Sequence, residues 1–140
     1  MVIKGGKGEM LISLNNIKEI HTILLKFSQE KLPIKLSYKI MKTLTACEKE
    51  LEFFQTKLNE LIQECAELDE QGQIIYTEDK QDIKIQNEKK DYFYEQYADL
   101  INLEIDLPVV LFNLDELENL SLTPQDMYYL NLILDTSEIE

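Results

Sequence analysis

Two cysteines and one histidine are the side chains of this chain that thiol or nucleophilic chemistry would use. A catalytic thiol needs a base within about 3.2 Å, and a zinc site needs several His or Cys ligands. The sequence contains no CxxC pair, Walker loop or GxSxG turn, and no motif places His21 beside Cys47 or Cys65. We therefore expect both cysteines in the core, His21 at the border of an apolar helix face, and a protein that is not an enzyme and has no catalytic, metal or cofactor site.

Three carboxylates, those of Glu78, Asp79 and Asp82, gather around a predicted turn, where oxygen ligands could bind calcium. An EF-hand loop alternates its ligands and has a glycine at its centre, and this segment has neither feature. We interpret the cluster as a solvated acidic face, which could contribute to a partner or ligand surface.

Four tyrosines are further candidates for a binding surface. Tyr92 and Tyr94 lie in one predicted helix, on sides other than its apolar stripe, and Tyr128 and Tyr129 lie in another. Partly exposed tyrosines are favoured at interfaces because they provide a large contact area with few rotatable bonds. They could also stack on a nucleobase, and ordinary core and rim packing is the alternative explanation.

The charge of the chain favours some partners and disfavours others. Its 14 basic residues are all Lys, and they face 27 Asp and Glu, which gives a formal net charge of -13. Binding to nucleic acid or anionic lipid depends on Lys and Arg displacing counterions, so we expect neither partner. The same charge would accelerate association with a basic protein, such as a nucleic-acid-binding or defence protein of a host cell.

The longest periodic signal in the chain is a heptad seam of apolar residues. Its members are Ile40, Leu44, Cys47, Leu51, Phe54, Leu58, Leu61, Cys65 and Leu68. Alternating steps of four and three predict one long helix over Ile34–Gln71, with Cys47 and Cys65 about 27 Å apart. That distance excludes a disulfide within the helix.

A helix this long needs a partner over its seam. The candidates are a predicted helix at Ile17–Phe27, a predicted helix at Tyr92–Leu103, and the same helix in a second subunit. The charges beside the seam are mostly acidic, so self-pairing would gain little from charge complementarity. We expect the chain to fold back on itself as a helical hairpin, and a homo-oligomer remains the alternative.

Shorter elements surround the long helix. Met10–Leu14 reads as a strand, and Asn15 or Asn16 is the expected cap of the first helix, which Pro33 closes off. QIIYT (73–77) and DIKIQ (82–86) alternate as a β-hairpin does, and Gly72 is the expected stop of the long helix.

The C-terminal part of the chain adds two helices and one apolar run. Asn87 is the expected cap of the helix that contains Tyr92, and LPVVLFNL (107–114) is predicted to pair as a strand with Met10–Leu14. Thr123 and Pro124 have the residue types of a helix start, so a last helix is expected to reach about Leu134. Together these elements predict an α+β fold that is mainly α, with four helices and a small antiparallel sheet.

The expected organisation is one α-dominated domain over residues 10–135, with a flexible leader at 1–9 and an acidic tail at 136–140. MVIKGGKGEM lacks the apolar region of a signal peptide, and no run reaches the roughly 18 apolar residues of a membrane span. These features predict a cytoplasmic protein that does not bind membranes, in the host cytoplasm if a phage encodes it.

The run ISLNNIKEIHTILLKFSQEKLPIKLSYKIMKTL and the closing LDELENLSLTPQDM resemble a family of small phage and prophage proteins of AT-rich Gram-positive bacteria. The resemblance covers roughly residues 10 to 134, and its most specific parts are EKLPIKLSYKI and LSLTPQDM. These parts are structural signatures, so no functional residue is carried over. The resemblance implies a protein that works by binding: one that blocks a host defence protein, mimics DNA, sequesters a nucleotide signal or assists virion assembly.

Three functions follow as hypotheses. The first is an acidic binding protein that blocks or sequesters a host component, and the second is an oligomeric structural or virion accessory protein. The third is a protein that sequesters a small nucleotide.

Overall fold

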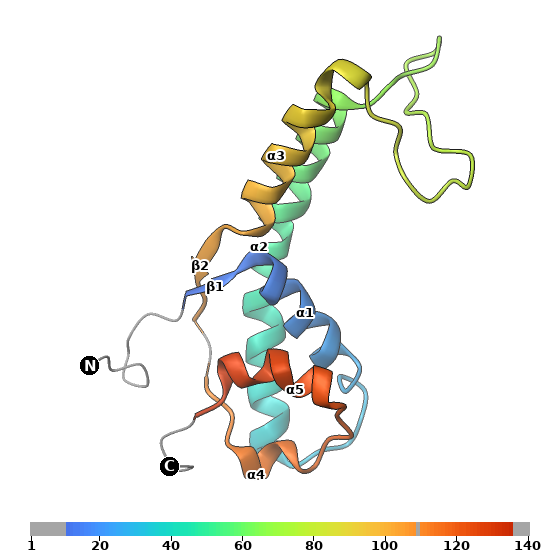
Figure 1. Cartoon of the computed structure of the whole chain (residues 1–140). Coiled ribbons are helices and arrows are strands. Elements are labelled where there is room, and N and C mark those ends of the chain that lie inside the picture. Colours follow the sequence, from blue (N-terminus) through green and yellow to red (C-terminus); the bar gives the residue numbers. More distant parts are fainter. Residues whose placement is uncertain (1–10, 109, 136–140) are drawn as a thin grey trace. The chain divides into compact units, whose positions relative to one another are not determined.

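The structure, a computed structural model, describes residues 11–108 and 110–135 of the chain. It contains two compact units, which we call unit 1 (Met1–Glu52 and Leu103–Glu140) and unit 2 (Phe53–Asn102). The long helix α2 (Ile34–Cys65) contributes its first part to unit 1 and its last part to unit 2 (Figure 1). The predicted leader at 1–9 and tail at 136–140 lie outside the described residues.

The predicted fold class is confirmed: the described chain is mainly helical, with one small antiparallel sheet. That sheet pairs β1 (Leu11–Ser13) with β2 (Glu104–Asp106), and Ile12 stands opposite Ile105. The prediction that LPVVLFNL pairs with the N-terminal strand was therefore wrong. Pro108 interrupts that run and has no N–H to donate to a ladder, while Leu107 and Phe112 are buried in the core of unit 1.

Helix α1 (Leu14–Leu25) begins at Ser13, whose hydroxyl accepts a hydrogen bond from the Asn16 N–H at 3.2 Å. The predicted cap at Asn15 or Asn16 was wrong, because the helix starts directly after β1 and both asparagines fall in its first turn. One face of α1 is buried in the core, and its residues are Leu14, Ile17, Ile20, Ile23 and Leu24.

In the C-terminal part of unit 1, the single-turn helix α4 (Leu114–Leu117) was not predicted. The predicted start of the last helix is confirmed: α5 (Pro124–Leu130) has Thr123 as its cap. The Thr123 hydroxyl accepts from the Asp126 N–H at 3.0 Å, and the Asp126 carboxylate accepts from the Thr123 N–H at 3.1 Å. After Leu130 the chain tightens into a 3₁₀ turn, η2 (Asn131–Ile133), so the α-helix is shorter than expected.

The seam of α2 is covered within the chain, by a different helix in each unit. In unit 1 the seam residues Ile40, Leu44 and Cys47 are all buried. Helix α1 lies beside this part of α2 (Figure 1), and its His21 bonds Glu48 of α2. In unit 2, α3 (Lys90–Ile101) lies along the last part of α2 (Figure 1), where Leu61 and Cys65 form a core cluster with Ile85. The predicted helical hairpin is thus confirmed.

Helix α2 ends at Cys65, six residues before the predicted end at Gln71. From Ala66 onward the backbone pairs with other segments: Ala66 bridges Ile85, Leu68 bridges Ile74, and Gly72, with φ of 81°, lies in the turn between these last two. Leu68, predicted as the last seam residue, is 47% exposed. Tertiary pairing overrides the heptad pattern at this point.

The predicted hairpin is present as isolated bridges rather than regular strands, with Tyr76 opposite Ile83. Three residues of these segments form a closed circuit of backbone hydrogen bonds. Glu67 N–H donates to Lys84 at 2.8 Å, Lys84 N–H donates to Ile75 at 2.9 Å, and Ile75 N–H donates back to Glu67 at 3.0 Å. This circuit fixes residues 66–86 as one bridged loop, which we call the circuit loop.

The predicted cap of α3 at Asn87 was also wrong. Asn87 begins a 3₁₀ turn, η1 (Asn87–Lys89), and α3 proper starts at Lys90. The helix then ends at Ile101, two residues before the expected Leu103, because β2 begins at Glu104.

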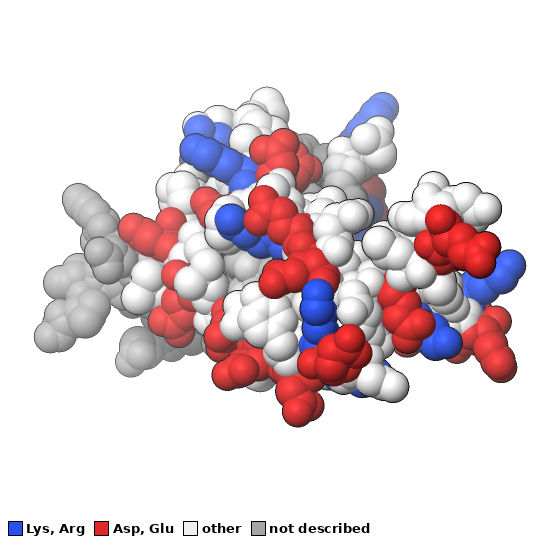
Figure 2. Space-filling view, turned by 90° about the horizontal axis from the view of Figure 1, so that it is seen from above, with Lys and Arg blue, Asp and Glu red and all other residues white. Residues whose placement is uncertain are grey.

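The excess of Asp and Glu over Lys in the sequence, 27 against 14, is visible on the surface (Figure 2). Figure 2 shows Asp and Glu spread widely over the face in view, with Lys side chains between them. None of the helices that the structure describes is long and apolar enough to cross a bilayer.

Candidate functional site

The acidic turn of the circuit loop is organised by hydrogen bonds of its own. The Asp79 carboxylate accepts from the Thr77 hydroxyl at 2.6 Å and from the Gln81 N–H at 3.1 Å. These bonds stabilise the charged form and hold the pKa of Asp79 below its usual range. Glu78 and Asp79 are exposed, and no group of three or more His, Cys, Asp or Glu within residues 11–108 and 110–135 could hold a metal ion.

The structure divides the predicted tyrosines between the two units. Tyr128 and Tyr129 lie in α5 of unit 1 as an edge-to-face pair with ring centroids 5.1 Å apart, and Tyr128 is 72% exposed. Tyr92 and Tyr94 lie in α3 of unit 2, both exposed. Unit 2 also holds the three predicted carboxylates, so five of the seven candidate residues belong to it.

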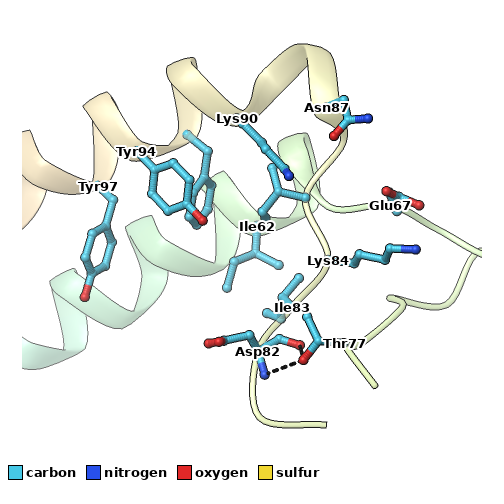
Figure 3. Close-up of a pocket in the computed structure, with 12 residues that line it drawn as sticks. Ile62, Glu67, Thr77, Asp82, Ile83, Lys84, Asn87, Lys90, Tyr94 and Tyr97 are labelled. Atoms are coloured by element: carbon cyan, nitrogen blue, oxygen red, sulfur yellow. Dashed lines mark hydrogen bonds between the residues drawn. The ribbon is translucent and has the colours of Figure 1, made fainter. Parts of the chain in front are cut away.

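A hollow of about 630 Å³ lies in unit 2 between α3, α2 and the circuit loop, and we call it the α3 hollow. Figure 3 shows Tyr94 and Tyr97 projecting from α3, with Ile62 of α2 between Tyr94 and the circuit loop and Asp82 on the loop side. The residues that line it are Ile62, Glu67, Thr77, Asp82, Ile83, Lys84, Ile85, Asn87, Lys90, Phe93, Tyr94 and Tyr97. Tyr94 and Asp82 are the two predicted site residues that the fold brings to this hollow.

Hydrogen bonds and ring packing hold the backbone that lines the hollow. Thr77 accepts from the Asp82 N–H at 3.3 Å, and its own N–H donates to the Asp82 carbonyl at 2.9 Å. On the helix side, Phe93 and Tyr97 stack with ring centroids 6.3 Å apart and pack against the core cluster of unit 2. The polar side chains of the hollow therefore extend from backbone segments that are hydrogen-bonded or packed on the core of unit 2.

Tyr92 lies in a second, smaller depression of unit 2, between α2 and α3. This acid groove has a volume of about 330 Å³ and is lined by Phe53, Lys57, Glu60, Leu61, Glu64, Tyr92, Gln96, Asp99 and Leu100. The Tyr92 hydroxyl donates to the Glu64 carboxylate at 3.4 Å. The negative charge of Glu64 raises the pKa of Tyr92, because it disfavours the phenolate.

Lys57, which lines the same groove, contacts both a carboxylate and an aromatic ring. The Lys57 ammonium lies 3.4 Å from the Glu60 carboxylate and 5.9 Å from the centroid of the Phe53 ring. Carboxylates and aromatic faces are the two groups that stabilise a cation at a protein surface.

The cysteines lie in the core, as predicted: both are completely buried and neither forms a disulfide. Burial, together with the charges of Glu48 and Glu50, raises the pKa of Cys47 to about 12. Burial and the charge of Glu64 also raise the pKa of Cys65. Both thiols are therefore protonated at neutral pH and poorly nucleophilic.

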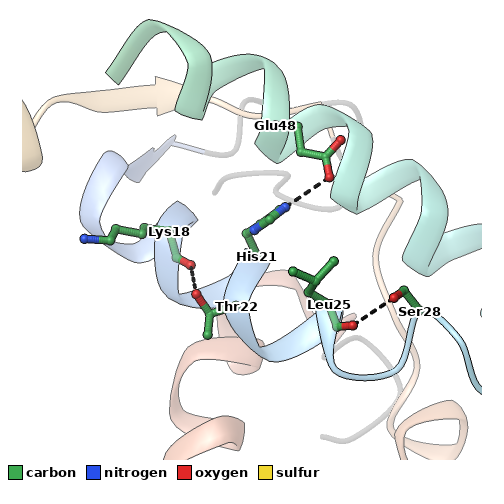
Figure 4. Close-up of polar contacts among 6 residues, drawn as sticks. All are labelled: Lys18, His21, Thr22, Leu25, Ser28 and Glu48. Atoms are coloured by element: carbon green, nitrogen blue, oxygen red, sulfur yellow. Dashed lines mark hydrogen bonds and ion pairs between the residues drawn. The ribbon is translucent and has the colours of Figure 1, made fainter. Parts of the chain in front are cut away.

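His21 occupies the predicted border position, with 18% of its side chain exposed. Its Nε2 atom lies 3.1 Å from the Glu48 carboxylate, so the imidazole ties α1 to α2 (Figure 4). Nearby, the Thr22 hydroxyl donates a hydrogen bond to the Lys18 carbonyl, and the Ser28 hydroxyl donates one to the Leu25 carbonyl. The three contacts that Figure 4 draws all stabilise the helices themselves.

The sequence did not identify the two lysines of the α3 hollow, Lys84 and Lys90, as candidate site residues. A signal for Lys90 was present: Lys90, Tyr94 and Tyr97 are spaced by four and three residues and so share one face of α3. Lys84 and Glu67 had no such signal, because the circuit loop brings them in from outside the helix.

No protein-family model, no curated protein and no solved structure matches this chain.

Proposed function

We propose that this protein is a non-enzymatic acidic binding protein that blocks or sequesters a basic component of a host cell. The acid groove is the observation that carries the proposal. Its exposed rings, Phe53 and Tyr92, stand among the carboxylates of Glu60, Glu64 and Asp99. A basic side chain of a partner protein would find both a counter-charge and an aromatic face there.

The Lys57 contacts support this choice of partner. A lysine of the chain already takes the position between a carboxylate and a ring, and Lys57 and Glu60 are both about half exposed. A surface ion pair of this kind contributes at most about 1 kcal/mol, so a partner's Arg or Lys could displace it.

The charge of the whole chain supports the same kind of partner. A net charge of -13 attracts basic proteins over a range of about 8 Å at physiological salt. Nucleic-acid-binding and defence proteins carry basic surfaces for phosphates, and a carboxylate-rich surface can compete for them. The resemblance to phage proteins favours this setting, in the host cytoplasm.

The test is retention of host proteins on the immobilised full chain, in lysate of a Gram-positive host, at low and at moderate salt. We expect a basic protein to be retained, more weakly as salt rises, and Glu64→Gln and Tyr92→Ala to reduce its retention. Glu95→Gln is the matched control, since Glu95 is exposed in α3, the helix of Tyr92, but does not line the groove. Duplex DNA should compete if the chain acts as a DNA mimic.

Two results would contradict the proposal. One is that no protein is retained at either salt concentration. The other is that Glu64→Gln lowers retention no more than Glu95→Gln does, which would remove the acid groove from the interaction.

A further inference from the structure

The α3 hollow differs from the acid groove in its size and in the lysines that line it. Its volume of about 630 Å³ lies within the range of small-molecule sites, and its walls offer aromatic rings, carboxylates and ammonium groups together. The acid groove is about half that size, and its only cation, Lys57, is paired with Glu60. The two depressions therefore suit different occupants.

Lys90 is the cation available to an occupant. Figure 3 shows its side chain reaching from the start of α3 toward Ile62. Its ammonium has no carboxylate within 4.0 Å among residues 11–108 and 110–135, although unit 2 carries more acidic residues than lysines. Lys84, the other lysine of the hollow, extends beside Glu67 and away from the tyrosines in the same view. An anion in the hollow would therefore meet Lys90.

Flat surfaces and acceptors complete the site. The exposed Tyr94 ring stands edge-to-face with Phe93, and Ile83 of the circuit loop provides an apolar surface on the loop side. The Asp82 carboxylate accepts no hydrogen bond from the part of the chain that the structure describes, so it can accept one from a ring amino group. A planar ring with N–H donors and an anionic substituent matches all three groups.

We propose that the α3 hollow binds a nucleotide, with the base against Tyr94, its amino group on Asp82 and its phosphate on Lys90. Stacking on a tyrosine ring accepts any base, since every base has a π-face. The ion pair with Lys90 distinguishes a nucleotide from a nucleoside. This inference does not depend on the proposed protein partner, because none of these three residues lines the acid groove.

The test is calorimetric titration of the full chain with AMP, GMP, adenosine and guanosine at low salt. We expect at least one nucleotide to bind, about tenfold more tightly than its nucleoside. Lys90→Gln should lower the affinity for that nucleotide by about five- to tenfold and leave the affinity for its nucleoside unchanged. Tyr94→Ala should lower both affinities. Lys80→Gln, with the same charge change in the same unit but outside the hollow, should leave every affinity unchanged.

The proposal is overturned if neither nucleotide binds at concentrations on the order of 1 mM, where a site of even about 4 kcal/mol would be half filled. It is equally overturned if Lys90→Gln weakens the nucleotide no more than Lys80→Gln does. Lys90 and Tyr94 are exposed, so both variants should fold, and their circular dichroism spectra would verify this. A failure here leaves the retention of a basic protein by the acid groove unaffected.

Discussion

The pKa of the Glu116 carboxyl is subject to opposing effects. Burial disfavours its charge, but the Asn113 N–H at 2.8 Å and the Lys39 ammonium at 2.8 Å outweigh it and hold the pKa of Glu116 below its usual range. A lowered pKa contributes stability above the unfolded-state value of about 4.3, and this stability is lost as pH falls through the folded-state value.

We therefore expect Glu116→Gln to lower the free energy of unfolding by about 1–2 kcal/mol at pH 7. The difference from wild type should shrink as the pH is lowered below the ordinary carboxyl range. Urea denaturation at several pH values measures it. Glu118→Gln, at an exposed position one residue beyond α4, is the control and should have little effect; an equal deficit at every pH would argue against the ionised contact.

The two thiols give a second prediction at the residue scale. Because Cys47 and Cys65 are completely buried and their pKa values are raised, neither should react with a thiol reagent in the folded protein at pH 7. Both should react at once in denaturant. Colorimetric titration of thiols with and without urea checks this, and rapid labelling of either cysteine in the native state would place that thiol at the surface.

The capping of α5 can be tested at the scale of the element. Thr123→Ala removes the acceptor of the Asp126 N–H and should cost about 1 kcal/mol of stability. Thermal denaturation measures the loss. Thr56→Ala, in the exposed middle of α2, removes the same atoms where no cap exists and should be neutral or slightly stabilising. If both variants lose the same stability, the hydroxyl of Thr123 is not acting as a cap.

Elements set by local patterns could be predicted from the sequence. The heptad spacing predicted α2 and its fold-back, and the alternation of residues 73–86 predicted the hairpin pairing. Thr123 and Pro124 gave the start of α5 for the same reason, since a cap acts within four residues.

Elements set by distant contacts could not be predicted. The heptad pattern continues to Leu68, and only the pairing of Ala66 with Ile85 ends α2 at Cys65. β1 found its partner at Glu104–Asp106, a segment with no apolar run to mark it. Of the candidate site, Tyr94 and Asp82 were identifiable by residue type, but their meeting in one hollow required the circuit loop.

At the scale of the whole molecule, the covering of the seam bears on oligomerisation. The seam residues Ile40, Leu44 and Cys47 are buried in unit 1, where His21 of α1 bonds α2. In unit 2, Leu61 and Cys65 belong to the core cluster on which Phe93 and Tyr97 of α3 pack, so the seam does not need a second chain. We expect a monomer of about 16.5 kDa in light scattering across micromolar concentrations. A dimer or larger species would instead favour the oligomeric accessory function.

The closed circuit of Glu67, Ile75 and Lys84 has a consequence for how the circuit loop opens. Each of these residues donates to one of the other two and accepts from the remaining one, so opening one segment breaks two of the three bonds at once. Their amide protons should therefore share one free energy of opening, as a single cooperative unit, measurable by native-state hydrogen exchange. Since the circuit uses backbone atoms alone, the side chains at 67 and 84 can be replaced without losing its frame, and the rim of the α3 hollow can change its ligand preference by single substitutions.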